Sequence, residues 1–264
     1  MNNNPEVSVI VTTYNRKELL YETIQSIIKQ TYNNFELIIV DNYSNYDYEN
    51  LMETIDDNRI KYFQNNNDGI IAINRNYGIN KAKGKFIAFC DDDDLWFPNK
   101  LQIQVDTLKK TESDMVFAMF EQFGAIDIFT RNHGIGPLPF RAKLTKNNLL
   151  NFNFIPCSSV LVKKTLIDRL GGFDERKTFV SIEDHDLWLK VIQNGKIHFI
   201  PKILIQYRVH KSNVSMSLKE MHNGLDELFE KHDSNFKKRE PIEKTRFYYY
   251  LRNIFYYIIY PYYS

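Results

Sequence analysis

Four consecutive aspartates, Asp91–Asp94, directly follow an apolar run of strand-forming residues, Phe86–Cys90. Like charges repel, so a buried strand end keeps four carboxylates only where a cation or hydrogen-bond donors reach them. Hard oxygen ligands of this kind suit Mg²⁺ or Mn²⁺, which often hold a phosphate group as well. A simpler interpretation is an acidic loop that caps a helix beginning near Pro98, for which Asp94 alone would be enough. We favour the metal site, because a cap needs one carboxylate and four are present.

A second pair of acids, Glu183 and Asp184, stands at the start of a predicted amphipathic helix that runs to about Asn194. Acids in a first helical turn complement the helix dipole, and that structural role is one interpretation. The other interpretation is catalytic, because the two tryptophans of the chain, Trp96 and Trp188, stand beside the two acidic clusters. A carboxylate next to apolar bulk has a raised pKa, which suits it to work as a general base.

Short apolar runs alternate with helical patterns over most of the chain, and they predict the elements that position these acids. A helix-start signal, Asn15 followed three residues later by Glu18, begins the first helix. Residues 124–150 show no clear period and predict a long loop, a kind of segment that often carries binding. We predict an α/β fold, a mostly parallel sheet with helices on both faces, with strands at 7–12, 35–41, 60–63, 86–89, 115–118, 155–162, 196–200 and 203–209, and helices at 18–30, 49–55, 70–81, 98–111 and 183–194.

Several polar residues fall at the carboxyl ends of predicted strands, where open α/β sheets bind ligands. Thr12 and Tyr14 follow the first strand and Asp41 ends the second, so they are expected to meet Asp91–Asp94 in one crevice. Taken singly, Tyr14 could be a packed loop aromatic and Asp41 an ordinary turn former. Neither a G-x-G-x-x-G nor a G-x-x-x-x-G-K-[ST] motif occurs, so a nicotinamide, flavin or P-loop site is not expected.

The composition of the 264 residues is that of a folding globular chain, with 43% hydrophobic residues and a net charge of +1. The first 230 residues contain no basic stripe interleaved with stacking aromatics, so nothing there suggests nucleic acid. The two cysteines, Cys90 and Cys157, lie in apolar runs and are expected to be buried thiols in a reducing cytoplasm. The chain shows no signal-peptide pattern and no run of about 18 apolar residues, so a cytoplasmic location is expected.

The end of the chain differs in character. His210 follows the last predicted strand beside Arg208 and Lys211, and it could be a metal ligand or a surface histidine. From residue 235 to 264 six Lys and Arg face two acids, and ten of the last twenty residues are aromatic. Such a helix could lie at the inner face of the plasma membrane, or it could pack on the core or on a dimer partner.

Several segments occur in an order and at spacings that resemble glycosyltransferase family 2, the inverting nucleotide-sugar transferases of GT-A fold. Each segment is weak alone, and the ordered set is specific. The resemblance covers roughly residues 6–215 and rests on Val7-Ser8-Val9-Ile10-Val11-Thr12-Thr13-Tyr14-Asn15-Arg16, Ile39-Val40-Asp41-Asn42, Asn67-Asp68-Gly69, Asn74-Arg75-Asn76-Tyr77-Gly78-Ile79, Asp91–Asp94, Gly171-Gly172-Phe173-Asp174, Glu183-Asp184-His185-Asp186-Leu187-Trp188-Leu189 and Tyr207-Arg208-Val209-His210.

The resemblance implies a role for each matching residue. Asp184 would be the catalytic base, with Glu183 beside it as the alternative. Asp93 would be the direct ligand of Mn²⁺ or Mg²⁺, and His210 a metal or diphosphate contact. The family often has a second acid where this chain has Asn42, which weakens any argument that needs two carboxylates there. The nucleotide contacts that it implies are Thr12, Tyr14, Asp41, Asn67, Arg75, Asp91 and Asp92.

The expected activity is metal-dependent, inverting transfer of a sugar from a nucleotide diphosphate, with UDP favoured, to a glycan or lipid-linked acceptor of bacterial surface polysaccharide synthesis. The catalytic part would span residues 1–215, with a nucleotide part to about 112 and an acceptor part beyond it, followed by a helical extension at 216–264. Two alternatives stay open from the residues alone: a metal-dependent phosphohydrolase or nucleotidyltransferase, and a non-catalytic saccharide-binding module.

Overall fold

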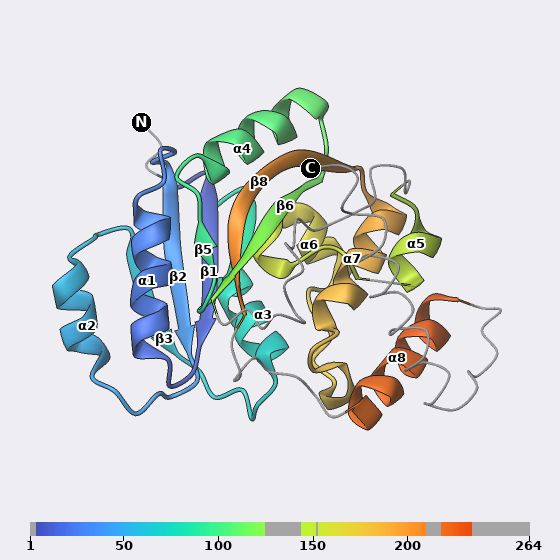
Figure 1. The fold of residues 1–264 in the computed structure, drawn as a ribbon, viewed down its shortest axis with the longest axis horizontal. Coiled ribbons are helices and arrows are strands. Elements are labelled where there is room, and N and C mark those ends of the chain that lie inside the picture. Colours follow the sequence, from blue (N-terminus) through green and yellow to red (C-terminus); the bar gives the residue numbers. More distant parts are fainter. Residues whose placement is uncertain (1–3, 125–143, 152, 210–217, 234–264) are drawn as a thin grey trace.

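The computed structural model describes residues 4–124, 144–151, 153–209 and 218–233. Their strands form one sheet in the order β3-β2-β1-β4-β7-β6-β8-β5, with helices on both faces (Figure 1). Four of the seven pairings between these described strands are parallel and three are antiparallel. The predicted α/β class with a mostly parallel sheet is therefore confirmed.

The first half of the sheet is entirely parallel. It consists of β1 (Val7–Thr13), β2 (Phe35–Asp41), β3 (Ile60–Gln64) and β4 (Phe86–Asp91). β1 lies between β2 and β4, and its last residues pair with the last residues of both neighbours. Because the strands run in the same direction, their carboxyl ends meet along one edge, as the sequence predicts.

The second half of the sheet mixes directions and completes the same edge. It contains β5 (Leu95–Trp96), β6 (Met115–Gly124), β7 (Val160–Lys163) and β8 (Ile197–Val209). β7 is antiparallel to both β4 and β6, whereas β6 and β8 run parallel. The short β5 follows the four aspartates and pairs with β8, so the acidic turn is held against the end of β8.

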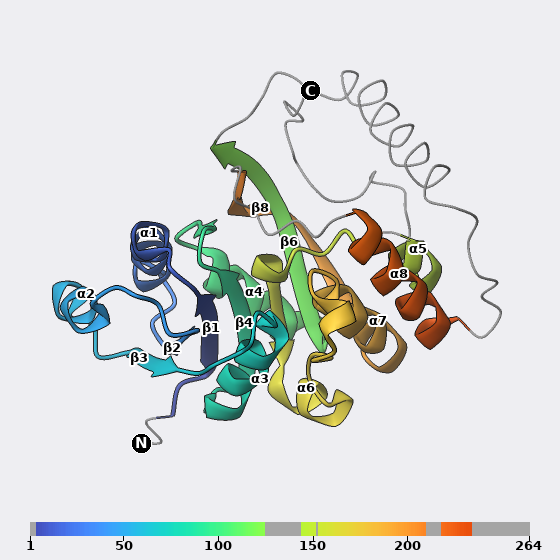
Figure 2. The same ribbon diagram turned by 90° about the horizontal axis from the view of Figure 1, so that it is seen from below.

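Two layers of apolar side chains hold the helices on the sheet, and alternate residues of each strand supply them. Val7 and Val9 of β1 belong to the layer that packs against α1 and α4, and Ile10 belongs to the layer under α3, α6 and α7. Figures 1 and 2 show these groups of helices on opposite sides of the sheet. The helices are α1 (Lys17–Ile28), α2 (Tyr48–Ile55), α3 (Ile71–Lys81), α4 (Lys100–Thr111), α5 (Lys146–Asn151), α6 (Lys164–Leu170), α7 (Glu183–Asn194) and α8 (Leu218–His232).

Some local predictions are wrong. The Asn15–Glu18 helix-start signal does not cap α1, because the N-cap residue is Arg16 and it makes no side-chain cap. Part of the strand predicted at 155–162 is instead a 3₁₀ turn, Cys157–Ser159, before β7 begins. The two strands predicted at 196–200 and 203–209 are one strand with an irregularity in its pairing to β6. The loop predicted at 124–150 contains α5, and its residues 125–143 lie outside the described residues.

The paired glycines that suggest close backbone approach do make one. Gly172 has a left-handed φ of 70°, and a Cβ atom there would lie 2.5 Å from the side-chain oxygen of Asn76. Asn76 accepts a hydrogen bond from the backbone N–H of Phe173 and donates one to its carbonyl, both at 2.9 Å. This contact holds α3 against the segment between α6 and α7. It therefore helps to position α7 relative to α3, and both helices carry residues of the predicted site.

A helix, α8, follows the sheet within the stretch predicted as a helical extension, of which the structure describes residues 218–233. Asp186 in α7 is fully buried, and its carboxylate lies 2.8 Å from both His232 Nε2 and Lys231 Nζ of α8. The basic aromatic tail from residue 235 to 264 is outside the described residues. Of the helices that the structure describes, none combines the length and hydropathy needed to span a bilayer. The division of the catalytic part at about residue 112 stays a prediction.

Candidate active site

The four aspartates after β4 separate into distinct environments. Asp91 is partly exposed and accepts a hydrogen bond from Arg75 Nη2 at 2.7 Å. Asp92 and Asp94 are buried, with 5% and 1% of their surface exposed. Asp93 pairs with Arg16 across the acidic turn. Each carboxylate therefore has a cation or a donor supplied from another element, which is the condition that a buried acidic run requires.

Arg16, just before α1, joins the middle two aspartates. Its Nη1 atom lies 3.0 Å from Asp92 Oδ1 and 3.0 Å from Asp93 Oδ2. The other oxygen of Asp92 accepts a hydrogen bond from Thr13 Oγ1 at 2.7 Å. Burial raises the pKa of Asp92 to about 6, although Arg16 and Thr13 favour its charged form. The neighbouring Thr12, predicted as a nucleotide contact, is buried at the end of β1.

Asp94 holds the acidic turn in place. It accepts hydrogen bonds from Ser158 Oγ at 2.6 Å and from the backbone N–H of Arg208 at 3.0 Å. Burial and the neighbouring carboxylates raise the pKa of Asp94 well above its ordinary value. The interpretation of Asp94 as a helix cap is wrong, because α4 begins at Lys100 and its N-cap residue is Asn99, without a side-chain cap. Asp94 instead links the turn to β8 and to the 3₁₀ turn before β7.

Arg75 of α3 connects the two acidic clusters. Only 5% of its surface is exposed, and Nη1 donates to Glu183 Oε1 at 2.5 Å while Nη2 donates to Asp91. Arg75 was predicted as a nucleotide contact, and its two described carboxylate partners come from the two clusters. An arginine can hold both acids at once because its donors form a rigid planar fork.

The two acids at the start of α7 have different surroundings. Glu183 is 5% exposed and held by Arg75, and its Oε2 atom has no hydrogen-bond partner among the described residues. Asp184 is partly exposed, and its Oδ1 atom accepts hydrogen bonds from Asn153 Nδ2 at 3.1 Å and from the backbone N–H of His185 at 2.7 Å. Burial and then the charge of Glu183 raise the pKa of Asp184 to about 7. A carboxyl with that pKa is suited to accept a proton near neutral pH.

The two tryptophans belong to the core around these clusters. Trp188 is fully buried one turn below Asp184, and its Nε1 donates to the carbonyl of Ile155. Trp96 lies under the ammonium group of Lys100, 3.7 Å from the ring centroid. Both residues are more than 95% buried, so they belong to the apolar core and offer no contact surface to a substrate.

The predicted nucleotide contacts at the ends of β1, β2 and β3 differ in accessibility. Tyr14 is 55% exposed beside the edge of the sheet. Asp41 is fully buried, and its carboxylate accepts hydrogen bonds from Ser44 and from the hydroxyl of Tyr62. The side-chain oxygen of Asn67 accepts a hydrogen bond from the N–H of Gly69 at 2.9 Å. In this structure Asp41 and Asn67 shape their loops, and Tyr14 is the accessible member of the set.

Some contacts of the site were not predicted. Arg16, Asn153 and Ser158 touch the predicted acids, but their roles depend on partners between 31 and 77 residues away. The one available signal was the position of Arg16 directly after a strand, in the run Thr-Tyr-Asn-Arg. His210 lies outside the described residues. Within the described residues no group of three or more His, Cys, Asp or Glu could hold a metal ion.

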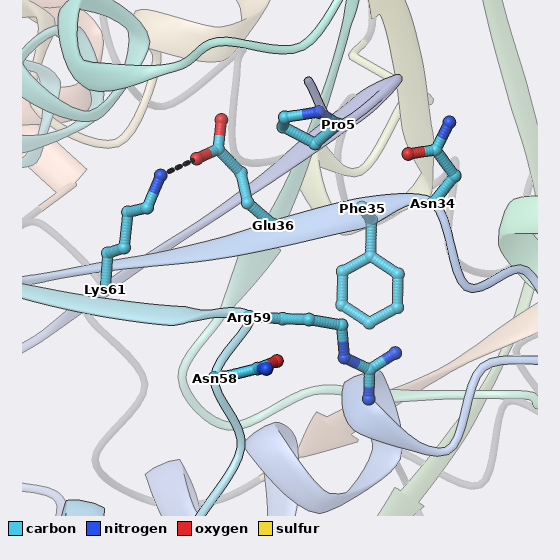
Figure 3. A pocket seen from close by; sticks show the side chains of 7 residues that line it. All are labelled: Pro5, Asn34, Phe35, Glu36, Asn58, Arg59 and Lys61. Atoms are coloured by element: carbon cyan, nitrogen blue, oxygen red, sulfur yellow. Dashed lines mark hydrogen bonds and ion pairs between the residues drawn. The ribbon is translucent and has the colours of Figure 1, made fainter. Parts of the chain in front are cut away.

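A pocket of about 200 Å³ lies at the other edge of the sheet, away from these clusters (Figure 3). Phe35 begins β2 there, and the guanidinium of Arg59 lies over its ring. The ammonium of Lys61 and the carboxylate of Glu36 are ion-paired across it. Because its charged groups already have partners and it faces the amino ends of the strands, we do not assign the pocket to the active site.

Comparison with known proteins agrees with this geometry. A family model described as "Glycosyl transferase family 2" matches residues 8–171. The chain is 32% identical over 225 residues to the Escherichia coli UDP-Glc:alpha-D-GlcNAc-diphosphoundecaprenol beta-1,3-glucosyltransferase WfgD, covering 84% of this chain and 85% of that protein. It is 31% identical over 210 residues to WfaP, an E. coli enzyme with the same activity in its name, covering 79% of each chain.

Solved structures show the same fold at lower sequence identity. S. aureus TarS 1-349 in complex with UDP-GlcNAc has a TM-score of 0.69 and 20% identity, over 88% of this chain and 68% of that chain. The mannosyltransferase PcManGT from Pyrobaculum calidifontis, in complex with GDP-Man and Mn²⁺, has a TM-score of 0.64 and 20% identity, over 96% of this chain and 72% of that chain. The family match, the relatives and the fold agree that this chain is a glycosyltransferase and belongs to glycosyl transferase family 2.

Proposed function

We propose that this glycosyltransferase moves a hexose or N-acetylhexosamine from a UDP-sugar to a hydroxyl of a lipid-linked saccharide, with inversion at the anomeric carbon and with a divalent cation. The observation that carries the proposal is the pair of acidic clusters joined by Arg75. One cluster ends a strand at the ligand-binding edge of the sheet, and the other offers Asp184 as a base. The alternative of a phosphohydrolase gives Asp184 no task.

Asp184 is the proposed base, and Glu183 is the less suitable of the two acids. Glu183 is held by the buried guanidinium of Arg75 and is itself buried, which leaves little access to a substrate hydroxyl. Asp184 is bound through one oxygen by neutral donors, and solvent reaches it. Its pKa of about 7 keeps a substantial charged fraction near neutral pH while making it basic enough to take a proton.

The reaction follows from these positions. Asp184 removes the proton of the acceptor hydroxyl as that oxygen attacks the anomeric carbon from the face opposite the nucleotide. The new carbon–oxygen bond forms while the bond to the diphosphate breaks, and its electron pair leaves with the diphosphate. A single displacement of this kind inverts the anomeric carbon. Asn153 and the N–H of His185 orient the carboxylate of Asp184 during the transfer.

The residues after β4 fit a divalent cation. Asp92 Oδ1 and Asp93 Oδ2 both lie 3.0 Å from one positively charged nitrogen of Arg16, so two carboxylate oxygens converge on one point. Mg²⁺ and Mn²⁺ are commonly bound by one or two carboxylates, with substrate phosphate oxygens and water as the other ligands. Asp93, with Asp92 beside it, would hold the ion, and His210 stays a proposed contact. A bound cation would neutralise charge that gathers on the departing diphosphate.

The relatives guide the choice of donor and acceptor. WfgD and WfaP are named for transfer from UDP-Glc to GlcNAc-diphosphoundecaprenol, and TarS was solved with UDP-GlcNAc. A lipid-linked acceptor brings the enzyme to a membrane surface, which is why we retain peripheral membrane contact through the basic residues of the tail, 235–264, as part of the proposal. A cytoplasmic location at the inner face of the plasma membrane follows from the same proposal.

The test is release of nucleotide from UDP-Glc, UDP-GlcNAc, UDP-Gal and GDP-Man by purified protein, with and without Mn²⁺ and with a GlcNAc-diphospholipid acceptor. We expect Mn²⁺-dependent release of UDP from one UDP-sugar, with a new glycosidic product of inverted configuration. Equal release without acceptor and no glycosidic product would indicate a hydrolase. A product with retained configuration would contradict Asp184 as the base of a single displacement.

A further inference from the structure

Arg16 occupies the point at which two of the four aspartates converge. Its Nη1 atom is 3.0 Å from Asp92 Oδ1 and 3.0 Å from Asp93 Oδ2. The three side chains are largely removed from solvent, with 23%, 7% and 13% of their surface exposed. The guanidinium of arginine keeps its charge at every physiological pH. The carboxylates proposed to hold a metal ion are thus neutralised in part by a cation of the protein itself.

Residues other than Arg16 also hold the acidic turn that carries these carboxylates. Thr13 Oγ1 donates to the second oxygen of Asp92 at 2.7 Å, and Arg208 Nε donates to the backbone carbonyl of Asp93 at 2.8 Å. Asp94, the next residue, is anchored by Ser158 and by the N–H of Arg208. The acidic turn therefore has several contacts from other elements besides those of Arg16.

The backbone of Arg16 is also held in place, whereas its long side chain has several rotatable bonds. The carbonyl of Arg16 accepts the first hydrogen bond of α1, from the N–H of Leu20 at 2.9 Å. Asn15, with a left-handed φ of 53°, is tied to the loop after β2 by hydrogen bonds with Ser44 at 2.7 Å and Asn45 at 2.8 Å. A flexible side chain on a fixed backbone can exchange one anionic partner for another without moving the loop.

We propose that the Arg16 guanidinium holds the place of the divalent cation in the donor-free protein, and that the cation and the donor diphosphate displace it together. This inference rests on the proposed function. A Mg²⁺ ion needs its oxygen ligands at about 2.0–2.1 Å, so an ion bound at the point where these two oxygens converge would take the place of Nη1. The diphosphate supplies a new anionic partner for the displaced guanidinium, with charge-assisted hydrogen bonds of the same kind.

The consequence is a coupling between metal and nucleotide. Without nucleotide, Mn²⁺ must compete with a positive charge that is already in place, so its affinity is low. With UDP bound, the guanidinium has phosphate oxygens to contact and the carboxylates are released. Such coupling is reciprocal, so Mn²⁺ must strengthen UDP binding by the same factor.

The test measures Mn²⁺ binding directly, by electron paramagnetic resonance of the free ion, with and without UDP. The wild type is compared with Arg16→Gln, which removes the charge, and with Arg59→Gln as the matched control. Arg59 has the same 23% side-chain exposure and also pairs with an aspartate, Asp57, but it lies at the other edge of the sheet. Thermal unfolding checks that each variant folds.

We expect Arg16→Gln to bind Mn²⁺ at least about tenfold more tightly than the wild type in the absence of nucleotide, because a unit charge in contact with both ligands is gone. The factor by which UDP strengthens Mn²⁺ binding should shrink in this variant and stay unchanged in Arg59→Gln. Arg16→Lys keeps the charge without the planar fork, so its Mn²⁺ affinity should lie between that of the wild type and that of Arg16→Gln. This second variant serves if Arg16→Gln does not fold.

Two results would overturn the inference, and they differ in what else they affect. In the first, nucleotide-free Arg16→Gln binds Mn²⁺ no more tightly than the wild type, while the wild type shows UDP-dependent Mn²⁺ binding. That result would show that Arg16 only organises the turn, and the proposed function would stand. Absence of Mn²⁺ binding by the wild type even with UDP would overturn both this inference and the metal dependence of the proposed function.

Discussion

The acids that end β4 and the acids that begin α7 are the same kind of side chain in two kinds of surroundings. Asp92 and Asp93 face the guanidinium of Arg16, and that cation balances much of their charge. Asp184 accepts hydrogen bonds from neutral donors, and burial, followed by the charge of Glu183, raises its pKa to about 7. A paired carboxylate suits cation binding, and an unpaired one suits proton transfer. The partners, rather than the aspartates themselves, divide the work.

Arg75 is what makes the two clusters one site. It is buried between Asp91 and Glu183, which are held by neighbouring atoms of one guanidinium. It also lowers the pKa of Asp184, although burial and Glu183 raise that pKa by more. The two clusters therefore share one buried cation.

The largest effect is expected from Asp184→Asn, which removes the base and keeps the shape of the side chain. Turnover should fall by about 10²- to 10⁴-fold, the usual contribution of a general base. The measurement is the rate of UDP release with acceptor at saturating donor. Glu183→Gln is the comparison, and a loss as large as that of Asp184→Asn with normal folding would favour Glu183 as the base.

Arg75→Met is expected to weaken both clusters at once. Two acids would lose their shared buried cation, so the free energy of unfolding should fall by about 3–5 kcal/mol in chemical denaturation. Because Arg75 lowers the pKa of Asp184, the acidic side of the pH–rate profile should also move to higher pH. Arg176→Met is the control, since Arg176 is 49% exposed and its pairing should contribute about 0–1 kcal/mol. A movement of the pH–rate profile to lower pH would contradict the conclusion that Arg75 lowers the pKa of Asp184.

The wild-type protein itself should show a pH-dependent kcat/KM that follows the charge of Asp184. Asp184 acts in its charged form, and its pKa is raised to about 7, so kcat/KM should rise with pH up to about 7 and then level off. Below that pH the charged fraction, and with it kcat/KM, should fall about tenfold for each pH unit. A rate that stays level down to pH 5 would show that the proton acceptor has an ordinary carboxylate pKa.

The clusters could be found from the sequence because each is a continuous run at the end of a strongly patterned element. An apolar strand that ends in four aspartates, and a helix that begins with Glu183 and Asp184, are local features. The alternation of strands and helices likewise predicted the carboxyl edge of the sheet on which the site lies. The acidic clusters and the order of strands and helices are determined by residues close together in the sequence, so they can be predicted from it.

The partners of the acids could not be found in this way. Arg16 contacts Asp93 across 77 residues, and Asn153 contacts Asp184 across 31. Apart from the position of Arg16 after the first strand, no local pattern distinguishes them from other polar residues of loops. Asn15 shows the same limit in reverse, because its side chain matches a helix cap in the sequence and instead accepts a hydrogen bond from Asn45 in the next loop. Tertiary contacts decide such positions.

Calorimetric titration of UDP into Asp93→Asn and Asp184→Asn, in the presence of Mn²⁺, tests most directly whether one cluster binds the metal ion and the other transfers the proton. The expected result is wild-type affinity, within about twofold, for Asp184→Asn and at least about tenfold weaker affinity for Asp93→Asn, because only the latter would lose a metal ligand. Equal loss of UDP affinity in both variants would contradict separate tasks for the two clusters. Unchanged affinity in Asp93→Asn would place the metal ligand elsewhere.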